Sequence, residues 1–141
     1  MMSIDLLTSP DGRVIGPIEF GDSEILSVAQ DRDTAVVRLE IYPFGDKSRI
    51  IQFTFEKLDF LFYAAGWFQN VVLDIYLFDD VSKTSPNDDE FTSQIRQEWR
   101  EVATRFSSAL LDRRTGPTLY FNSAAENVLL VTCERFVVEE V

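Results

Sequence analysis

Three runs of alternating apolar and polar residues between Ser23 and Phe55 constrain the fold of this chain more than any other feature. The runs read SEILSVAQ, TAVVRLEIY and SRIIQFTF, and the short polar segments DRD and PFGDK separate them. An alternation of period two is typical of a strand with one buried face and one face in water. Short polar connections favour antiparallel pairing of successive strands. The sequence therefore predicts a three-stranded meander, with Gly45 free to take a positive φ in the second turn.

A change of period after residue 86 predicts one long α-helix. Apolar residues then recur at spacings of three and four, which places them on one stripe of a helix. These residues are Phe91, Ile95, Trp99, Val102, Phe106 and Leu110. Asn87 is the expected N-cap, with Glu90 three residues on, and Gly116-Pro117 is the expected stop. We expect an amphipathic helix near residues 88–114.

The remaining segments predict further strands. Val71–Phe78 is apolar on both faces apart from Asp74, which is typical of a strand in the middle of a structure. Thr118–Phe121 and Val128–Glu140 alternate again, the second as one long strand or as two. Residues 57–66 fit either a strand or a helical turn, and we favour a strand that follows a bulge.

Together these patterns predict an α+β fold. A mainly antiparallel sheet of about seven strands would contain the meander, and the long helix would pack on it. The sheet is the only expected partner large enough to cover the apolar stripe of the helix. At 141 residues the chain has the length of a single domain, residues 1–141, and no repeat or linker divides it.

The composition excludes several kinds of chemistry. The chain contains no histidine, which removes the commonest general base and every Ser-His-Asp or Cys-His arrangement. Cys133 is the only cysteine, so an internal disulfide and a cysteine-based zinc site are both excluded. No glycine-rich phosphate loop and no GxSxG motif is present. We therefore expect no catalytic residue, no metal site and no cofactor.

The charge disfavours two kinds of partner. The chain has 24 acidic and 13 basic residues and a formal net charge of −11, and such a field repels phosphate backbones and anionic lipid. We expect neither nucleic acid nor a membrane as partner.

On the helix, Arg96, Arg100 and Arg105 are offset by Glu98 and Glu101, which predicts a mixed solvated face. No apolar run approaches the roughly 20 residues that span a bilayer and no export signal is evident, so a cytoplasmic location is expected.

The densest acidic group surrounds the expected start of the helix. It consists of Asp79, Asp80, Asp88, Asp89 and Glu90. One interpretation is a partner-binding surface for basic side chains, and another is a set of capping carboxylates that favour the positive end of the helix dipole. A calcium loop would need alternating oxygen ligands and a glycine at the sharp turn, a spacing that is missing here.

A second candidate site is a pocket between helix and sheet. Trp67, Phe68 and Trp99 could line it, although aromatic stripes more often form plain core. Asp74 is the one acid in an otherwise apolar run. If it is buried, its pKa would rise and it would need a partner, for which Arg38 and Arg49 are candidates.

The order of four segments resembles a class of small bacterial β-rich proteins that includes immunity proteins encoded beside contact-dependent toxins. The segments read DSEILSVAQDRDTAVVRLEIY, RIIQFTFEKLDFL, QNVVLDIYLFDD and LYFNSAAENVLLVTCERFVVEE. The likeness covers roughly residues 22–140 as a pattern of alternation, departs from that class at the long helix, and carries over no functional residue. The charge of −11 and the missing catalytic chemistry predict a non-catalytic protein that captures a basic partner, and the resemblance suggests a toxin domain as that partner.

Two other functions remain open. The chain could be a small-molecule-binding protein or a carboxylate-based enzyme with the aromatic pocket described above. It could also be a self-associating subunit, in which an exposed strand edge or an aromatic patch forms a symmetric homodimer.

Overall fold

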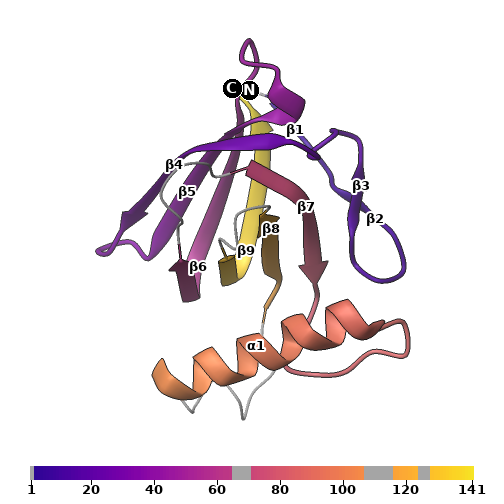
Figure 1. Cartoon of the computed structure of the whole chain (residues 1–141). Helices are drawn as coiled ribbons and strands as arrows, with labels where there is room; N and C mark the ends of the chain where they lie inside the picture. Colours follow the sequence, from indigo (N-terminus) through magenta and orange to yellow (C-terminus); the bar gives the residue numbers. More distant parts are fainter. Residues whose placement is uncertain (1, 65–70, 107–115, 124–127) are drawn as a thin grey trace.

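A computed structural model describes residues 2–64, 71–106, 116–123 and 128–141 (Figure 1). Within these residues the chain forms one α-helix, a short 3-10 turn and nine strands. In chain order they are β1 (Met2–Ser3), β2 (Leu7–Thr8), β3 (Val14–Gly16), β4 (Ser23–Asp31), β5 (Val36–Tyr42), η1 (Pro43–Gly45), β6 (Ile51–Ala64), β7 (Val71–Phe78), α1 (Glu90–Phe106), β8 (Thr118–Ser123) and β9 (Val128–Glu140).

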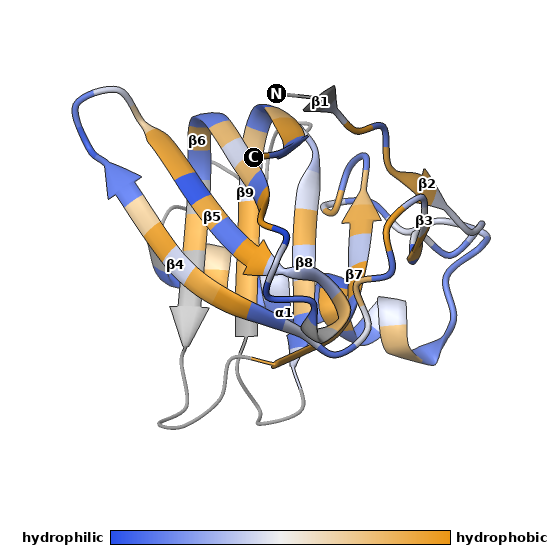
Figure 2. Cartoon of the chain, turned by 90° about the horizontal axis from the view of Figure 1, so that it is seen from above, coloured by the Kyte–Doolittle hydropathy of each residue, from blue (hydrophilic) through white to orange (hydrophobic). Residues whose placement is uncertain are grey.

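Six of the strands close into an antiparallel barrel. They follow the order β9-β6-β5-β4-β7-β8, and β8 pairs with β9 to complete the ring. Figure 2 shows these strands from above, with the hydropathy alternating along β4 and β5. The predicted α+β fold with a mainly antiparallel sheet is confirmed. Its closure was not predicted, because the β4–β7 and β6–β9 ladders join strands that are not neighbours in the sequence.

The meander of β4, β5 and β6 forms as predicted. In the β5–β6 ladder Leu39 lies opposite Phe53 and Ile41 opposite Ile51, and all four side chains are fully buried. Their polar neighbours face outward, as period two requires. The turn between β5 and β6 differs in one detail: Phe44 takes a positive φ of 45°, next to the Gly45 at which we expected it.

The ambiguous segment after Phe55 is a strand, because β6 continues to Ala64 alongside β9. We expected the bulge at Glu56-Lys57, ahead of this segment. Lys57 does have a positive φ of 51°, but the register shift lies between Leu58 and Phe60, so the bulge falls inside the strand. Residues 65 and 66 lie outside the described residues. The partner strand β9 is one continuous strand, which settles the alternative of two.

Strands β7 and β8, together with residues 129–133 of β9, bury most of both faces, because each face meets a different core. Their inward side chains join the barrel interior, as Ile75, Phe121 and Val131 do. Their outward side chains pack under α1. These side chains are Tyr76, Phe78, Tyr120 and Leu130. The prediction of an apolar two-sided strand is confirmed for β7. One residue differs: the register shifts between Val72 and Asp74, and Leu73 is 46% exposed.

Helix α1 begins two residues later than the sequence suggested. Asp89 is the N-cap instead of Asn87: its Oδ1 accepts the Thr92 N–H at 2.8 Å, and the Thr92 Oγ1 accepts the Asp89 N–H at 2.9 Å. This reciprocal pair satisfies two donors that a helix start leaves open, which Asn87 could not do from its position. The predicted helix end near residue 114 lies outside the described residues.

Trp99 joins the helix to the barrel. Its indole is fully buried, and its Nε1 donates a hydrogen bond to Thr132 Oγ1 of β9 at 3.0 Å. The Thr132 hydroxyl lies 2.8 Å from Thr118 Oγ1 of β8, so these buried polar groups satisfy one another. One side chain therefore connects α1 with two strands.

We expect Trp99→Ala to lower the free energy of unfolding by about 3–5 kcal/mol, because the substitution opens a cavity between helix and barrel. Gln94→Ala is the matched control, since Gln94 is exposed on the same helix and its truncation should change stability by less than about 0.5 kcal/mol. Equilibrium denaturation in urea measures both. Equal effects of the two substitutions would show that α1 is not anchored through Trp99.

Candidate functional site

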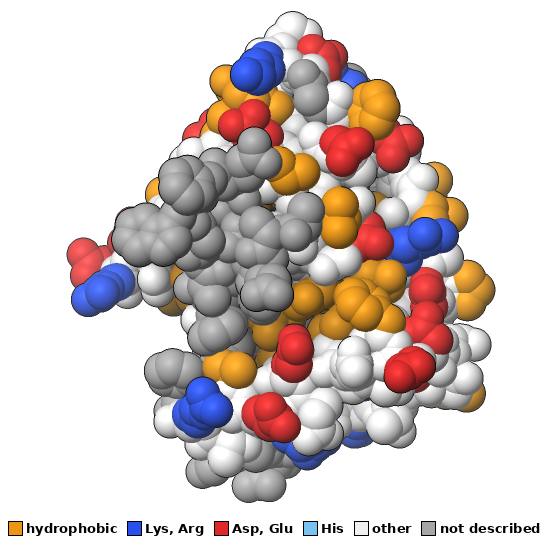
Figure 3. Space-filling model, viewed as in Figure 1, with side chains coloured by type: hydrophobic (Ala, Val, Ile, Leu, Met, Phe, Trp, Pro, Cys, Tyr) orange, Lys and Arg blue, Asp and Glu red, His pale blue; other side chains and the backbone are white. Residues whose placement is uncertain are grey.

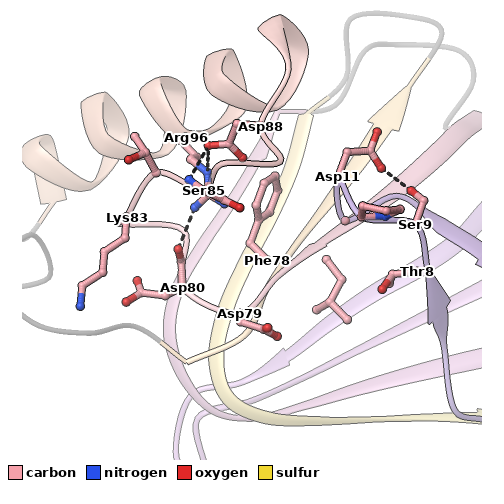
Figure 4. A pocket seen from close by; sticks show the side chains of 14 residues that line it. Thr8, Ser9, Asp11, Phe78, Asp79, Asp80, Lys83, Ser85, Asp88 and Arg96 are labelled. Atoms are coloured by element: carbon pink, nitrogen blue, oxygen red, sulfur yellow. Dashed lines mark hydrogen bonds and ion pairs between the residues drawn. The ribbon is translucent and has the colours of Figure 1, made fainter.

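A pocket of about 300 Å³ opens where three segments of the chain meet (Figure 4). Its walls are the N-terminal hairpin at residues 8–12, the chain from Leu77 to Asp88, and the side chain of Arg96 on α1. Three members of the predicted acidic group line it, namely Asp79, Asp80 and Asp88. Asp11 joins them from a distant part of the sequence.

Gly12 allows the hairpin to lie against β7 and form one wall. The Leu77 N–H donates a hydrogen bond to the Gly12 carbonyl oxygen at 2.8 Å, and the backbones of Arg13 and Tyr76 form an isolated antiparallel β-bridge. Gly12 has a φ of 93°, and a Cβ at this position would lie 2.7 Å from the Leu77 carbonyl oxygen. Glycine alone tolerates both this φ and this close approach without strain.

Arg96 is held in a fixed position inside the pocket. Its Nε lies 2.8 Å from Asp88 Oδ2, and its Nη1 donates to the Asp80 carbonyl oxygen at 2.7 Å. Its guanidinium carbon lies 4.9 Å from the centre of the Phe78 ring, within the range of a cation–π contact. The Arg96 and Asp88 side chains are only 13% and 9% exposed. The prediction of a solvated helix face is therefore wrong for Arg96.

The carboxylates of the pocket are held by short local hydrogen bonds. Asp11 accepts the Ser9 hydroxyl and the Arg13 N–H, and these bonds, with Ser9 the larger cause, lower its pKa. Asp80 Oδ1 accepts both the N–H and the hydroxyl of Ser82. Because Asp11 stays ionised well below neutral pH, it is poorly matched to general base catalysis there.

Acidic side chains outnumber basic ones in the pocket. Its lining includes the four aspartates named above and two basic residues, Lys83 and Arg96. Since Asp88 already pairs with Arg96, Asp11, Asp79 and Asp80 remain against Lys83, and Asp79 is exposed to solvent. Figure 3 shows several acidic side chains beside the start of α1, with others spread over the same face.

The other two members of the acidic group have different places. Asp89 caps α1, which is the structural interpretation offered above, and Glu90 is exposed in the first helical turn. Among residues 2–64, 71–106, 116–123 and 128–141, no group of three or more His, Cys, Asp or Glu side chains is arranged to hold a metal ion.

The predicted aromatic pocket is not assembled from its described members. Trp99 is fully buried in the helix–barrel core, and Trp67 and Phe68 lie outside the described residues. Asp74 lines a separate pocket of about 260 Å³ beside the N-terminal hairpin.

Asp74 also has a different partner from the two arginines that we considered. Asn122 Nδ2 donates to its carboxylate at 2.9 Å. Arg49 instead pairs with Glu140 at 2.6 Å, and Arg38 is exposed on β5. Asp74 is only half-buried, so the condition under which it would need an arginine is not met.

Burial under α1 changes the acidity of two tyrosines. It raises the pKa of Tyr76 from 10.0 to about 12, with a smaller contribution from Asp74, and it raises the pKa of Tyr120 to about 12, with help from Glu98. Burial likewise raises the pKa of Cys133 to about 12, so its thiol stays protonated and unreactive at neutral pH.

We expect Arg96→Leu to destabilise the fold by about 3–5 kcal/mol, because it leaves the Asp88 carboxylate buried without its cation. Arg105→Leu, an exposed substitution on the same helix, should cost less than about 0.5 kcal/mol. Adding Asp88→Asn to Arg96→Leu should recover part of the loss. Urea denaturation of the three variants tests the pair, and an unchanged midpoint in Arg96→Leu would contradict it.

The two tyrosines predict a loss of stability in alkali. Between pH 10.0 and about 12 the unfolded chain releases these protons while the folded chain keeps them. The unfolded state then binds fewer protons, so the free energy of unfolding falls as pH rises through this window. Ultraviolet absorbance of the phenolate measures the titration. Tyr76→Phe and Tyr120→Phe should each remove a component near pH 12, and its persistence in both variants would refute the assignment.

Comparison with known proteins identifies no relative. No protein-family model, curated protein or solved structure matches the chain. Among the described residues, no helix combines the length and the apolar character that crossing a bilayer requires. The function has to be argued from the geometry of the site.

Proposed function

We propose that this chain is a non-catalytic binding protein whose acidic pocket receives a basic side chain of a protein partner. The observation that carries the proposal is that Asp11 and the exposed Asp79 line the same pocket as an Arg96–Asp88 pair that is already neutralised. A partner's lysine or arginine would meet two carboxylates that, unlike Asp88, do not pair with Arg96.

The pocket has a size that suits one side chain better than a whole metabolite. Its volume of about 300 Å³ is at the lower end of the range for small-molecule sites. Ten of its fourteen lining residues are polar or charged, and Leu77 and Phe78 are its only large apolar side chains, so it offers little apolar surface for a drug-sized ligand. The net charge of −11 would steer a basic protein towards the chain before contact.

The partner class follows from the resemblance drawn from the sequence. An immunity-type protein would bind a basic toxin domain in the cytoplasm. An acidic chain without a histidine or a reactive thiol suits that non-catalytic role. The resemblance suggests a toxin domain, whereas the basic character of the partner is argued from the charge of −11 and from the pocket. A nucleic acid or a membrane surface would meet the unfavourable charge instead.

The double substitution Asp11→Asn and Asp79→Asn tests the pocket. An amide keeps the local hydrogen-bond acceptor of Asp11 and removes the charge, so the fold should remain intact. Host extract passed over the immobilised chain at low salt should yield a basic protein. We expect that protein to bind the double variant about tenfold more weakly, because two charge-assisted contacts are lost.

Glu101→Gln with Glu134→Gln is the matched control, because both residues are exposed and neither lines the pocket. This variant loses the same net charge, so it should bind the recovered protein almost as well as the unchanged chain. Equal weakening of the two double variants would mean that overall charge, and not the pocket, binds the partner. Recovery of no basic protein even at low salt would refute the proposal.

A further inference from the structure

A second pocket, here called the hairpin pocket, adjoins the contact between the N-terminal hairpin and β7. Its volume is about 260 Å³. It is lined by residues 13–15 and 18–21 of the N-terminal segment and by Leu73 and Asp74 of β7. The acidic pocket begins at the neighbouring residue, Gly12, and reaches β7 at Leu77. Figure 1 shows the hairpin of β2 and β3 beside β7. The hairpin therefore contributes a wall to each pocket.

The hairpin pocket is built on the barrel core. Three of its lining residues, Val14, Ile18 and Phe20, are buried members of that core. Two further apolar lining residues are open to water, since Ile15 is 59% exposed and Leu73 is 46% exposed. Exposed apolar side chains that occur singly are normal on a protein surface. Two of them in one pocket, next to core side chains, form a surface that can bury an apolar group.

A bulge in β7 causes the exposure of Leu73. Val72 pairs with Ser123 and Asp74 pairs with Asn122, so Leu73 is the extra residue between two successive pairs. In a regular strand Leu73 would share the inward face of Ile75, which is fully buried. The bulge turns the leucine towards solvent instead. Bulges often redirect a side chain beside a functional site, and this one places an apolar side chain in the hairpin pocket.

The two pockets are close enough for one segment of a partner. Burial is the main cause of the raised pKa of Tyr76, and the charges of Asp74 in the hairpin pocket and Asp11 in the acidic pocket add to it. Both carboxylates therefore lie near the same hydroxyl. From Leu73 to Leu77 the strand advances about 13 Å. In an extended segment, two side chains three or four residues apart are separated by about 10–13 Å.

We propose that the hairpin pocket receives a large apolar side chain of the same partner whose basic side chain enters the acidic pocket. This inference rests on the function proposed above and specifies the partner: an extended segment with a lysine or arginine three or four residues from a large apolar residue. The apolar residue contacts Ile15 and Leu73, in the manner of an interface anchor beside charged contacts. A second copy of the chain fits less well, since two chains of charge −11 repel each other.

Short capped peptides are the probe, titrated into the full isotope-labelled chain and followed by NMR. Peptides with two or three serines between a lysine and a leucine, in either order, cover both spacings and both chain directions. We expect at least one of them to shift the amide signals of Ile15 and Leu73 together with those of Asp11 and Asp79. Exchange of its leucine for alanine should weaken binding about tenfold, because the aliphatic carbons lose their burial, and should remove the shifts at Ile15 and Leu73.

Variants of the chain locate the apolar contact. Ile15→Ser with Leu73→Ser changes two largely exposed side chains, so the fold should be retained. This variant should bind the lysine–leucine peptide about threefold to tenfold more weakly and the lysine–alanine peptide as well as the unmodified chain does. Leu26→Ser with Phe44→Ser is the matched control, because both residues are exposed and neither lines either pocket. It should bind both peptides normally.

The inference and the proposed function fail in different ways. If the leucine and alanine peptides bind equally and Asp11→Asn with Asp79→Asn weakens both, the acidic pocket is supported and the hairpin pocket is refuted. If Asp11→Asn with Asp79→Asn changes neither affinity, the acidic pocket is refuted and the inference is overturned with it.

Three further results would overturn the inference alone. One is the absence of any leucine-dependent shift at Ile15 and Leu73 with every peptide at millimolar concentration. Another is equal binding of a peptide in which alanine replaces the lysine, because the pocket would then accept apolar groups without the basic residue. The third is a dimer in light scattering whose formation shifts the same two amides without peptide, since a second copy would then be the occupant.

Discussion

Strands β7 and β8 and residues 129–133 of β9 must bury both of their faces, and most of the structure depends on this constraint. A sheet that is covered on one side leaves the other apolar face of such strands in water, so they need a second layer. Curling the sheet into a barrel covers the inner face with the aromatic cluster around Phe53 and Phe121, whose ring centres are 5.4 Å apart. Helix α1 then covers the outer face, and Trp99 fixes its position on β8 and β9.

Local periodicity predicted the elements well because it records the burial of each residue. The alternation in β5 and β6 and the stripe of Ile95 and Trp99 on α1 both match the observed core. Barrel closure was not predictable in this way, because period two states that a face is buried and does not state what buries it. The pairings that close the ring join residues as distant as Ile51 and Glu140, and no local pattern encodes them.

The candidate site shows the same limit at the level of single residues. Asp79, Asp80 and Asp88 could be found because they are close in the sequence, whereas Asp11 reaches the pocket only through the contact of Gly12 with β7. Arg96 directly follows the buried Ile95, at the margin of the apolar stripe. A cation at such a margin can turn towards the core when a carboxylate and an aromatic ring meet it, and this position was the signal available in the sequence.

The N-terminal hairpin completes the pocket by pairing with a part of β7 that β4 does not reach. Strand β4 pairs with β7 at Ser23–Val72 and Glu24–Val71, and in this antiparallel register Tyr76 and Leu77 lie beyond the residue at which β4 begins. The edge of β7 there would lack a partner from β4, and unpaired edges tend to be covered. The hairpin covers it through Gly12 and Arg13, and the same contact brings Asp11 to the acidic pocket.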